Sequence, residues 1–116
     1  MTIRPAEPGE LIHEPTCEAG ESKFVADYDG EVLGWVAISR IETTSGEQLW
    51  LHDIAHNGPD PMGLVRLMLR ARKQAREWGF DEFYTNVTLD SPLAGVWLDH
   101  GFELAQLILK GKTHGN

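Results

Sequence analysis

The 116-residue chain carries a formal net charge of −8 and is 41% hydrophobic and 24% charged, which is typical of one globular domain. The acidic balance disfavours general binding to nucleic acid or to an anionic membrane. No apolar run approaches the ~20 residues that cross a bilayer, and no basic segment followed by an apolar one marks a secretory leader. The single cysteine, Cys17, excludes an intramolecular disulfide framework. We therefore expect a cytoplasmic protein with a single domain over residues 1–116.

The first half of the chain reads as strands joined by turns. Residues 1–22 are loop-rich, with Pro, Gly and Glu interrupting all but one short strand, Thr2–Arg4. Asp29-Gly30 is a strong two-residue hairpin signal, and residues 43–46 form a second turn. The alternation of apolar and polar residues around these turns predicts three strands of an antiparallel meander, at residues 23–28, 31–41 and 49–55.

The second half alternates helices with strands. A helix is predicted over Met62–Trp78, with Asp60 as its N-cap, Pro61 at its first position and Gly79 ending it. Its expected buried stripe is Leu64, Val65, Met68, Ala71, Ala75 and Trp78. The remaining elements are a strand at 80–87, a short helix at 92–100 capped by Ser91, a strand at 102–109 and a polar, frayed tail at 111–116.

This order of elements, with three local segments, resembles the GNAT (Gcn5-related N-acetyltransferase) family. The segments are Phe24–Ile38, which is similar to the second and third strands of the family, Ile54–Phe80, which is similar to its central motif, and Ser91–Phe102, which is similar to its closing helix. The resemblance covers residues 23–110. It implies an α/β (α+β) fold with a mixed, mostly antiparallel sheet, one long crossover helix and a short C-terminal helix.

The resemblance also implies acetyl-CoA as co-substrate and an amine as acceptor. In the family, a glycine-rich loop before the central helix binds the pyrophosphate through backbone N–H groups. Here that loop is about two residues shorter, Pro59 and Pro61 lack an N–H group, and Asp60 adds a negative charge. The residues placed at the cofactor by the resemblance are Ala55, His56, Gly58, Met62, Gly63, Leu64, Ser91 and Trp97.

Two neighbouring residues are candidates for the general base. His52 stands where the family often has a glutamate, and Asp53 follows it; a neutral imidazole could deprotonate an ammonium group through water. The alternative for His52 is a partly exposed strand histidine without a chemical role. Trp97 takes the position of the family's tyrosine acid and offers no acidic proton.

His52 and His56 are also spaced like the histidines of a helical zinc motif. On a strand, however, four residues span roughly 13 Å, which is too far for one ion. We therefore expect no metal.

The central helix carries Arg66, Arg70, Arg72, Lys73 and Arg76, half of the ten basic residues in the chain. They form either a solvated face or a surface for the CoA 3′-phosphate or for an acidic protein partner. The alternative to an acetyltransferase is accordingly a catalytically degenerate GNAT-like domain that acts through protein contacts, as an assembly or inhibitory subunit, for example of a virus or mobile element.

Because residues 5–22 are too short for the two helices that shape the family's acceptor site, that site is either open or completed by a second subunit in a homodimer.

Overall fold

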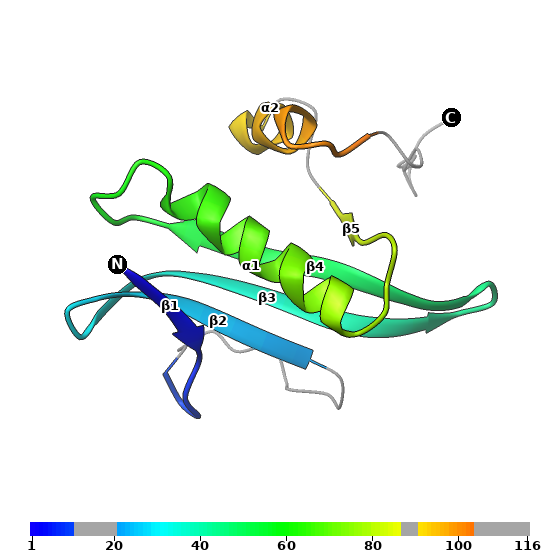
Figure 1. Cartoon of the computed structure of the whole chain (residues 1–116), viewed down its shortest axis with the longest axis horizontal. Helices are drawn as coiled ribbons and strands as arrows, with labels where there is room; N and C mark the ends of the chain where they lie inside the picture. Colours follow the sequence, from blue (N-terminus) through cyan, green and yellow to red (C-terminus); the bar gives the residue numbers. More distant parts are fainter. Residues whose placement is uncertain (11–20, 87–90, 104–116) are drawn as a thin grey trace, which may run out of the picture. The chain divides into compact units, whose positions relative to one another are not determined.

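The computed structural model describes residues 1–10, 21–86 and 91–103 (Figure 1). The chain divides into two units, Met1–Asn86 and Val87–Asn116, and each is described by itself; the single domain over 1–116 stays a prediction. The first unit contains β1 (Thr2–Pro5), β2 (Glu21–Tyr28), β3 (Glu31–Thr43), β4 (Gly46–His56), α1 (Gly63–Glu77) and β5 (Tyr84–Thr85). The second contains α2 (Pro92–Asp99).

The five strands form one mixed sheet in the order β1-β2-β3-β4-β5. The first three pairings are antiparallel, whereas β4 and β5, which are joined through α1, are parallel. The Asp29-Gly30 turn forms as predicted, with φ of 54° and 95°, the left-handed pair that a type I′ hairpin requires. The mixed, mostly antiparallel α/β sheet expected from the sequence is therefore confirmed.

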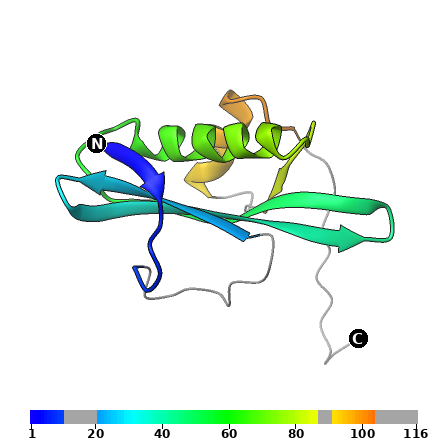
Figure 2. The same ribbon diagram turned by 60° about the horizontal axis from the view of Figure 1, so that its bottom comes forward.

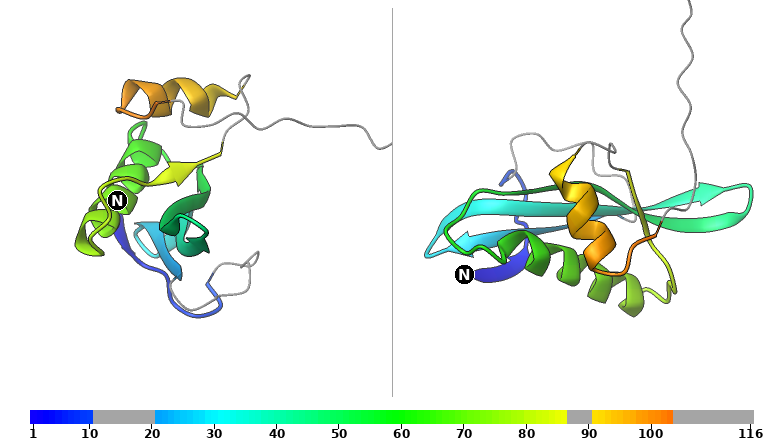
Figure 3. Two further views of the ribbon diagram at one scale, coloured as in Figure 1. Left: turned by 90° about the vertical axis from the view of Figure 1, so that its right-hand side faces the viewer. Right: turned by 90° about the horizontal axis from the view of Figure 1, so that it is seen from above.

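Helix α1 lies along one face of this sheet (Figures 2 and 3). Strand residues with at most 2% of their surface exposed meet buried residues of the helix there, in a core made of Phe24, Ala26, Val36, Ile38, Leu49, Leu51, Leu67, Ala71 and Ala75. The predicted stripe is wrong in one respect. Leu67 is fully buried, while Leu64 and Val65 are only half-buried, so the buried face is rotated toward Leu67.

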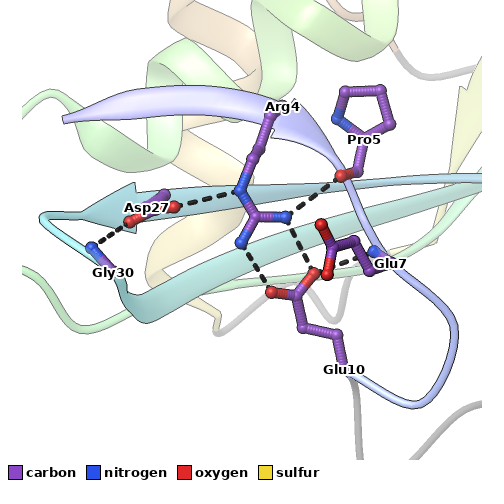
Figure 4. A network of polar contacts seen from close by, with 6 residues as sticks. All are labelled: Arg4, Pro5, Glu7, Glu10, Asp27 and Gly30. Carbon is purple, nitrogen blue, oxygen red and sulfur yellow. Dashed lines mark hydrogen bonds and ion pairs between the residues drawn. The ribbon is translucent and has the colours of Figure 1, made fainter.

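An ionic cluster around Arg4 ties β1 to β2 and to the loop after β1 (Figure 4). The Arg4 guanidinium donates to both oxygens of the Glu10 carboxylate, at 2.9 and 2.5 Å, and to Asp27 at 3.0 Å. The hydrogen bond from Arg4, aided by one from the Glu7 N–H, lowers the pKa of Glu10 to about 2. The same guanidinium lowers the pKa of Asp27, and these bonds, that to Glu10 foremost, raise the pKa of Arg4.

The later predicted elements are shorter than expected or cannot be compared. Within the described residues 80–86, the strand predicted at 80–87 is observed at Tyr84–Thr85, and Phe80 and Phe83 pack against the core. The strand predicted at 102–109 lies mostly, and the tail at 111–116 wholly, outside the described residues, as do residues 11–20 of the predicted N-terminal loop. No helix in the described part of the chain is long and apolar enough to cross a membrane.

Candidate active site

A bulge in β4 places both candidate bases at the same bend. Ala37 of β3 pairs with Asp53 and Ile38 pairs with Leu51, so His52 is the extra residue of β4. A bulge bends its strand and redirects the side chains there, and bulges are frequent beside active sites. On the other edge of β4, the described part of β5 pairs with Trp50 and Leu51. His52 and Asp53 therefore follow directly after the paired stretch, and both are exposed.

The Asp53 carboxylate is held in place by a tryptophan on the neighbouring strand. The Trp35 indole N–H donates to Asp53 Oδ2 at 2.8 Å. Oδ1 accepts no hydrogen bond from another described residue, so one oxygen of an oriented carboxylate is open to solvent. Asp53 pairs with Ala37, between Val36 and Ile38, whose side chains meet α1; because alternate residues of a strand face opposite sides, Asp53 lies on the face away from the helix.

The rings of Tyr28 and His56 fill the space between the end of β4 and the start of α1. The sequence did not predict that they lie together. The Tyr28 hydroxyl and His56 Nε2 are 2.5 Å apart. A Cβ atom at Gly63 would overlap the His56 ring, and one at Gly58 would overlap the Tyr28 ring. Both glycines are thus explained by aromatic packing. The space that a side chain would take at these two glycines is occupied by Tyr28 and His56.

The entry to α1 differs from the predicted cap. The N-cap residue is Met62, without a side-chain capping bond, so the assignment of Asp60 as N-cap is wrong. Asp60 lies two residues earlier, where its carboxylate accepts the Met62 N–H at 2.9 Å and its carbonyl accepts the Gly63 N–H at 3.0 Å. Pro59 and Pro61 flank Asp60 and fix the backbone of this tight turn. The other carboxylate oxygen of Asp60, Oδ2, pairs with Arg66 at 3.3 Å.

Two backbone N–H groups at the start of α1 have no hydrogen-bond acceptor in the described part of the chain. The N–H groups of Leu64 and Val65 have no acceptor among the described residues, as expected for the first turn of a helix. The partial positive charge of a helix N-terminus adds to their attraction for an anion. The first turn of α1 can therefore bind phosphate through backbone groups alone, although Asp60 opposes it with a negative charge.

In the second unit, the two predicted contact residues have structural roles of their own. Ser91 caps α2, its hydroxyl accepting the Leu93 N–H at 3.2 Å, as predicted. Trp97 is 2% exposed, its ring lies 5.4 Å from that of Phe102, and its indole N–H is buried without a partner among the described residues. Their proposed contacts with the cofactor stay predictions.

The structure brings most of the predicted site residues to one end of the first unit. His52, Asp53 and Ala55 lie on the last part of β4, His56 ends it, and Gly58, Met62, Gly63 and Leu64 follow in the turn and at the helix start. Trp35 and Tyr28 were missed. Their contacts join residues 18 and 28 positions apart, for which no local pattern gives a signal. The described residues contain no group of three or more His, Cys, Asp or Glu side chains arranged for a metal ion.

Several solved structures share this fold. Aminoglycoside N-acetyltransferase AAC(6′)-Iy in complex with CoA has a TM-score of 0.78 and 16% identity, covering 98% of this chain and 100% of that one. Aminoglycoside 6′-N-acetyltransferase AAC(6′)-IG from Acinetobacter haemolyticus, an apo structure, has a TM-score of 0.75 and 14% identity, covering 100% of both chains. A candidate acetyl transferase from Pyrococcus furiosus has a TM-score of 0.74 and 22% identity, covering 82% of this chain and 67% of that one.

No protein-family model matches the sequence, and no curated protein sequence matches it. At these sequence identities the structural similarity establishes the fold, whereas the chemistry has to be argued from the residues of the site. The chain therefore has the fold of the GNAT acetyltransferases, at 14–22% identity to the structures compared.

Proposed function

We propose that this chain is an N-acetyltransferase that transfers the acetyl group of acetyl-CoA to an amine. The observation that carries the proposal is the β4–α1–β5 crossover, in which the β4 bulge presents His52 and Asp53 at the end of the paired stretch. The free N–H groups of Leu64 and Val65 lie at the start of the same crossover helix. The similarity to acetyltransferase structures, one of them holding CoA, supports a CoA thioester as donor.

The residues of the site divide the work as follows. The N–H groups of Leu64 and Val65, with the positive end of α1, bind the anionic phosphates of acetyl-CoA. Asp53, oriented by Trp35, or its neighbour His52 removes a proton from the ammonium group of the acceptor, directly or through water. The free amine nitrogen then attacks the thioester carbonyl carbon, a C–N bond forms, the nitrogen releases its second proton to solvent, and the C–S bond breaks. The CoA thiolate takes its proton from solvent.

Calorimetric titration with acetyl-CoA tests the first half of this proposal. We expect a dissociation constant below roughly 100 μM, about −5.5 kcal/mol. Absence of heat and of any thermal shift at millimolar CoA would remove the acetyltransferase proposal and leave the binding-subunit alternative.

Turnover tests the second half. Release of the CoA thiol is followed with an aminoglycoside, a polyamine and a peptide with a free N-terminus as acceptors. Asp53→Asn keeps an acceptor for the Trp35 indole but cannot take a proton, so we expect turnover to fall about 100-fold with unchanged acetyl-CoA affinity. His52→Ala is measured in parallel, since either residue could be the base. Glu42→Gln, an exposed change elsewhere in the same hairpin, is the control. Unchanged turnover in both variants would exclude both residues as the base.

A further inference from the structure

A groove of about 390 Å³ lies between β1 and α1, and none of the residues that line it is assigned to acetyl transfer. It is lined by Met1, Ile3, Arg66, Leu69, Arg70 and Lys73, and is called the basic groove below. The three cations recur at helical positions 66, 70 and 73, which face the same side of an α-helix. Arg72 and Arg76, the other two basic residues of the helix, do not line it.

Two of the three cations have no negative partner in the part of the chain that the structure describes. Arg66 pairs with Asp60 at 3.3 Å, but within the described part of the chain Arg70 and Lys73 form no ion pair. The Arg70 guanidinium lies 4.1 Å from the centre of the Phe24 ring, and its Nη1 atom is buried without a hydrogen-bond partner among the described residues. A buried donor without an acceptor is unfavourable for the folded chain. Stacking thus holds the guanidinium plane in place while part of its donor capacity is unused.

Apolar side chains lie beside these cations. Leu69 is 44% exposed and Met1 36% exposed, and Ile3 is half-buried between them and the core. Leu69 is one of the few large apolar residues that α1 exposes, and it stands between Arg66 and Arg70 in the sequence. The complementary ligand therefore has an apolar side chain flanked by carboxylates.

We propose that the basic groove binds an acidic peptide segment of a partner protein, with an apolar side chain on Leu69 and Ile3 and carboxylates at Arg70 and Lys73. Although the chain carries −8 overall, five of its ten Lys and Arg residues lie between positions 66 and 76, so the local charge is positive. A two-fold dimer through the groove would place Arg70 and Lys73 against their own copies, which repel. The lining includes no aromatic ring, so nothing there would stack on the bases of a nucleic acid.

The test uses a peptide array in which a central Leu or Phe is flanked by one to four Asp or Glu residues, with a matched array carrying Lys instead. Hits are measured by fluorescence anisotropy on the full chain, tagged at its C-terminus because Met1 lines the groove. We expect acidic peptides to bind with dissociation constants below about 100 μM, and the lysine peptides not to bind.

Variants then locate the binding site. Arg70→Ala combined with Lys73→Ala should weaken binding at least tenfold, and Leu69→Ser, a change at an exposed position, at least threefold. Arg76→Ala removes a cation of the same helix outside the groove and should leave binding unchanged. Thermal unfolding of each variant confirms that it is folded, and turnover with a small amine should not change, which separates this proposal from the acetyltransferase proposal.

Three outcomes would overturn it: no acidic peptide binding below 1 mM, binding that survives the double alanine variant, or equal loss in Arg76→Ala. An oligonucleotide or an anionic phospholipid vesicle that binds more tightly than every peptide, and loses binding in the double variant, would assign the groove to that ligand and reject the peptide.

Discussion

At the scale of single residues, two glycines of the first unit are explained by neighbouring rings. Gly63 begins α1 directly against His56, and Gly58 lies against Tyr28, whose hydroxyl meets His56 at 2.5 Å. Gly95, in the middle of α2, has nothing within 4 Å of where a Cβ would stand. The same substitution is therefore expected to act in opposite directions at the two helices.

Gly63→Ala should lower the free energy of unfolding by about 1–3 kcal/mol, because the new methyl group overlaps the His56 ring. Gly95→Ala should raise it by about 0.5–1 kcal/mol, because alanine is the better helix former and the site has room. Chemical denaturation measures both. In a His56→Ala background the clash is gone, so the cost of Gly63→Ala should largely disappear; a cost that persists there would rule out the ring as its cause.

The Arg4 cluster makes a second prediction, on acid stability. The pKa of Glu10 is lowered to about 2 and that of Asp27 is also lowered. Their contribution to stability is therefore complete above the ordinary carboxyl pKa of ~4 and is lost as the pH falls through the folded values. Between pH 5 and 2 the free energy of unfolding should fall more steeply in the native chain than in Arg4→Gln, where both carboxyls lose the hydrogen bond that lowers their pKa most. Equal slopes in urea denaturation would contradict this.

At the scale of elements, the turn into α1 decides how well the helix can bind an anion. The Asp60 carboxylate accepts the Met62 N–H and so stands next to the free donors of the first turn. A negative charge there competes with a phosphate for the positive end of the helix. The main role of the turn is consequently to end β4 and begin α1, and its negative charge weakens anion binding.

Asp60→Asn keeps the acceptor for Met62 and removes the charge. Unit charges ~5 Å apart in water interact by about 0.8 kcal/mol, so we expect acetyl-CoA to bind about fourfold more tightly at low salt, with the difference shrinking at 300 mM NaCl. Asp81→Asn, an equal charge change at an exposed position beyond the other end of α1, should not alter binding. Equal affinity of Asp60→Asn and the native chain in calorimetry would show that no phosphate approaches this helix end.

Elements with local chemical signals could be predicted from the sequence, and elements set by packing could not. The Asp29-Gly30 turn, the Ser91 cap and the stop of α1 at Gly79, which has φ of 84°, each depend on one or two residues and their neighbours. Leu64 and Leu67 are both apolar and nearly adjacent on the helix surface, so only the sheet decides which of them is buried. The length of β5 also depends on tertiary structure, because a strand at this position forms only where it pairs with β4, at Trp50 and Leu51.

The candidate site divides in the same way. His52 and Asp53 were found through the resemblance to a family that often has a glutamate at the position of His52, but the bulge at His52 arises from pairing with β3. Trp35, which orients Asp53, and Tyr28, which meets His56, lie on other strands. The periodicity of apolar residues describes one element at a time, so it could not predict contacts between residues on different strands.

At the scale of the whole molecule, charge is the property that most distinguishes this chain. The chain has eighteen acidic and ten basic residues, and half of the basic residues lie on α1. The sheet and its loops therefore carry a larger negative charge than the net value suggests. Self-repulsion of this kind opposes the folded state and is screened by salt.

The melting temperature should accordingly rise by a few degrees between 10 and 300 mM NaCl at pH 7.5, because screening weakens repulsion among like charges more than it weakens the Arg4 cluster, whose partners lie at 2.5–3.0 Å. At pH 5.0, the isoelectric point of the sequence, the net charge is zero and the same salt change should have almost no effect. Differential scanning calorimetry at both pH values separates the two conditions. A melting temperature that falls with salt at pH 7.5 would mean that attractive ion pairs, the Arg4 cluster foremost, outweigh repulsion in the folded chain.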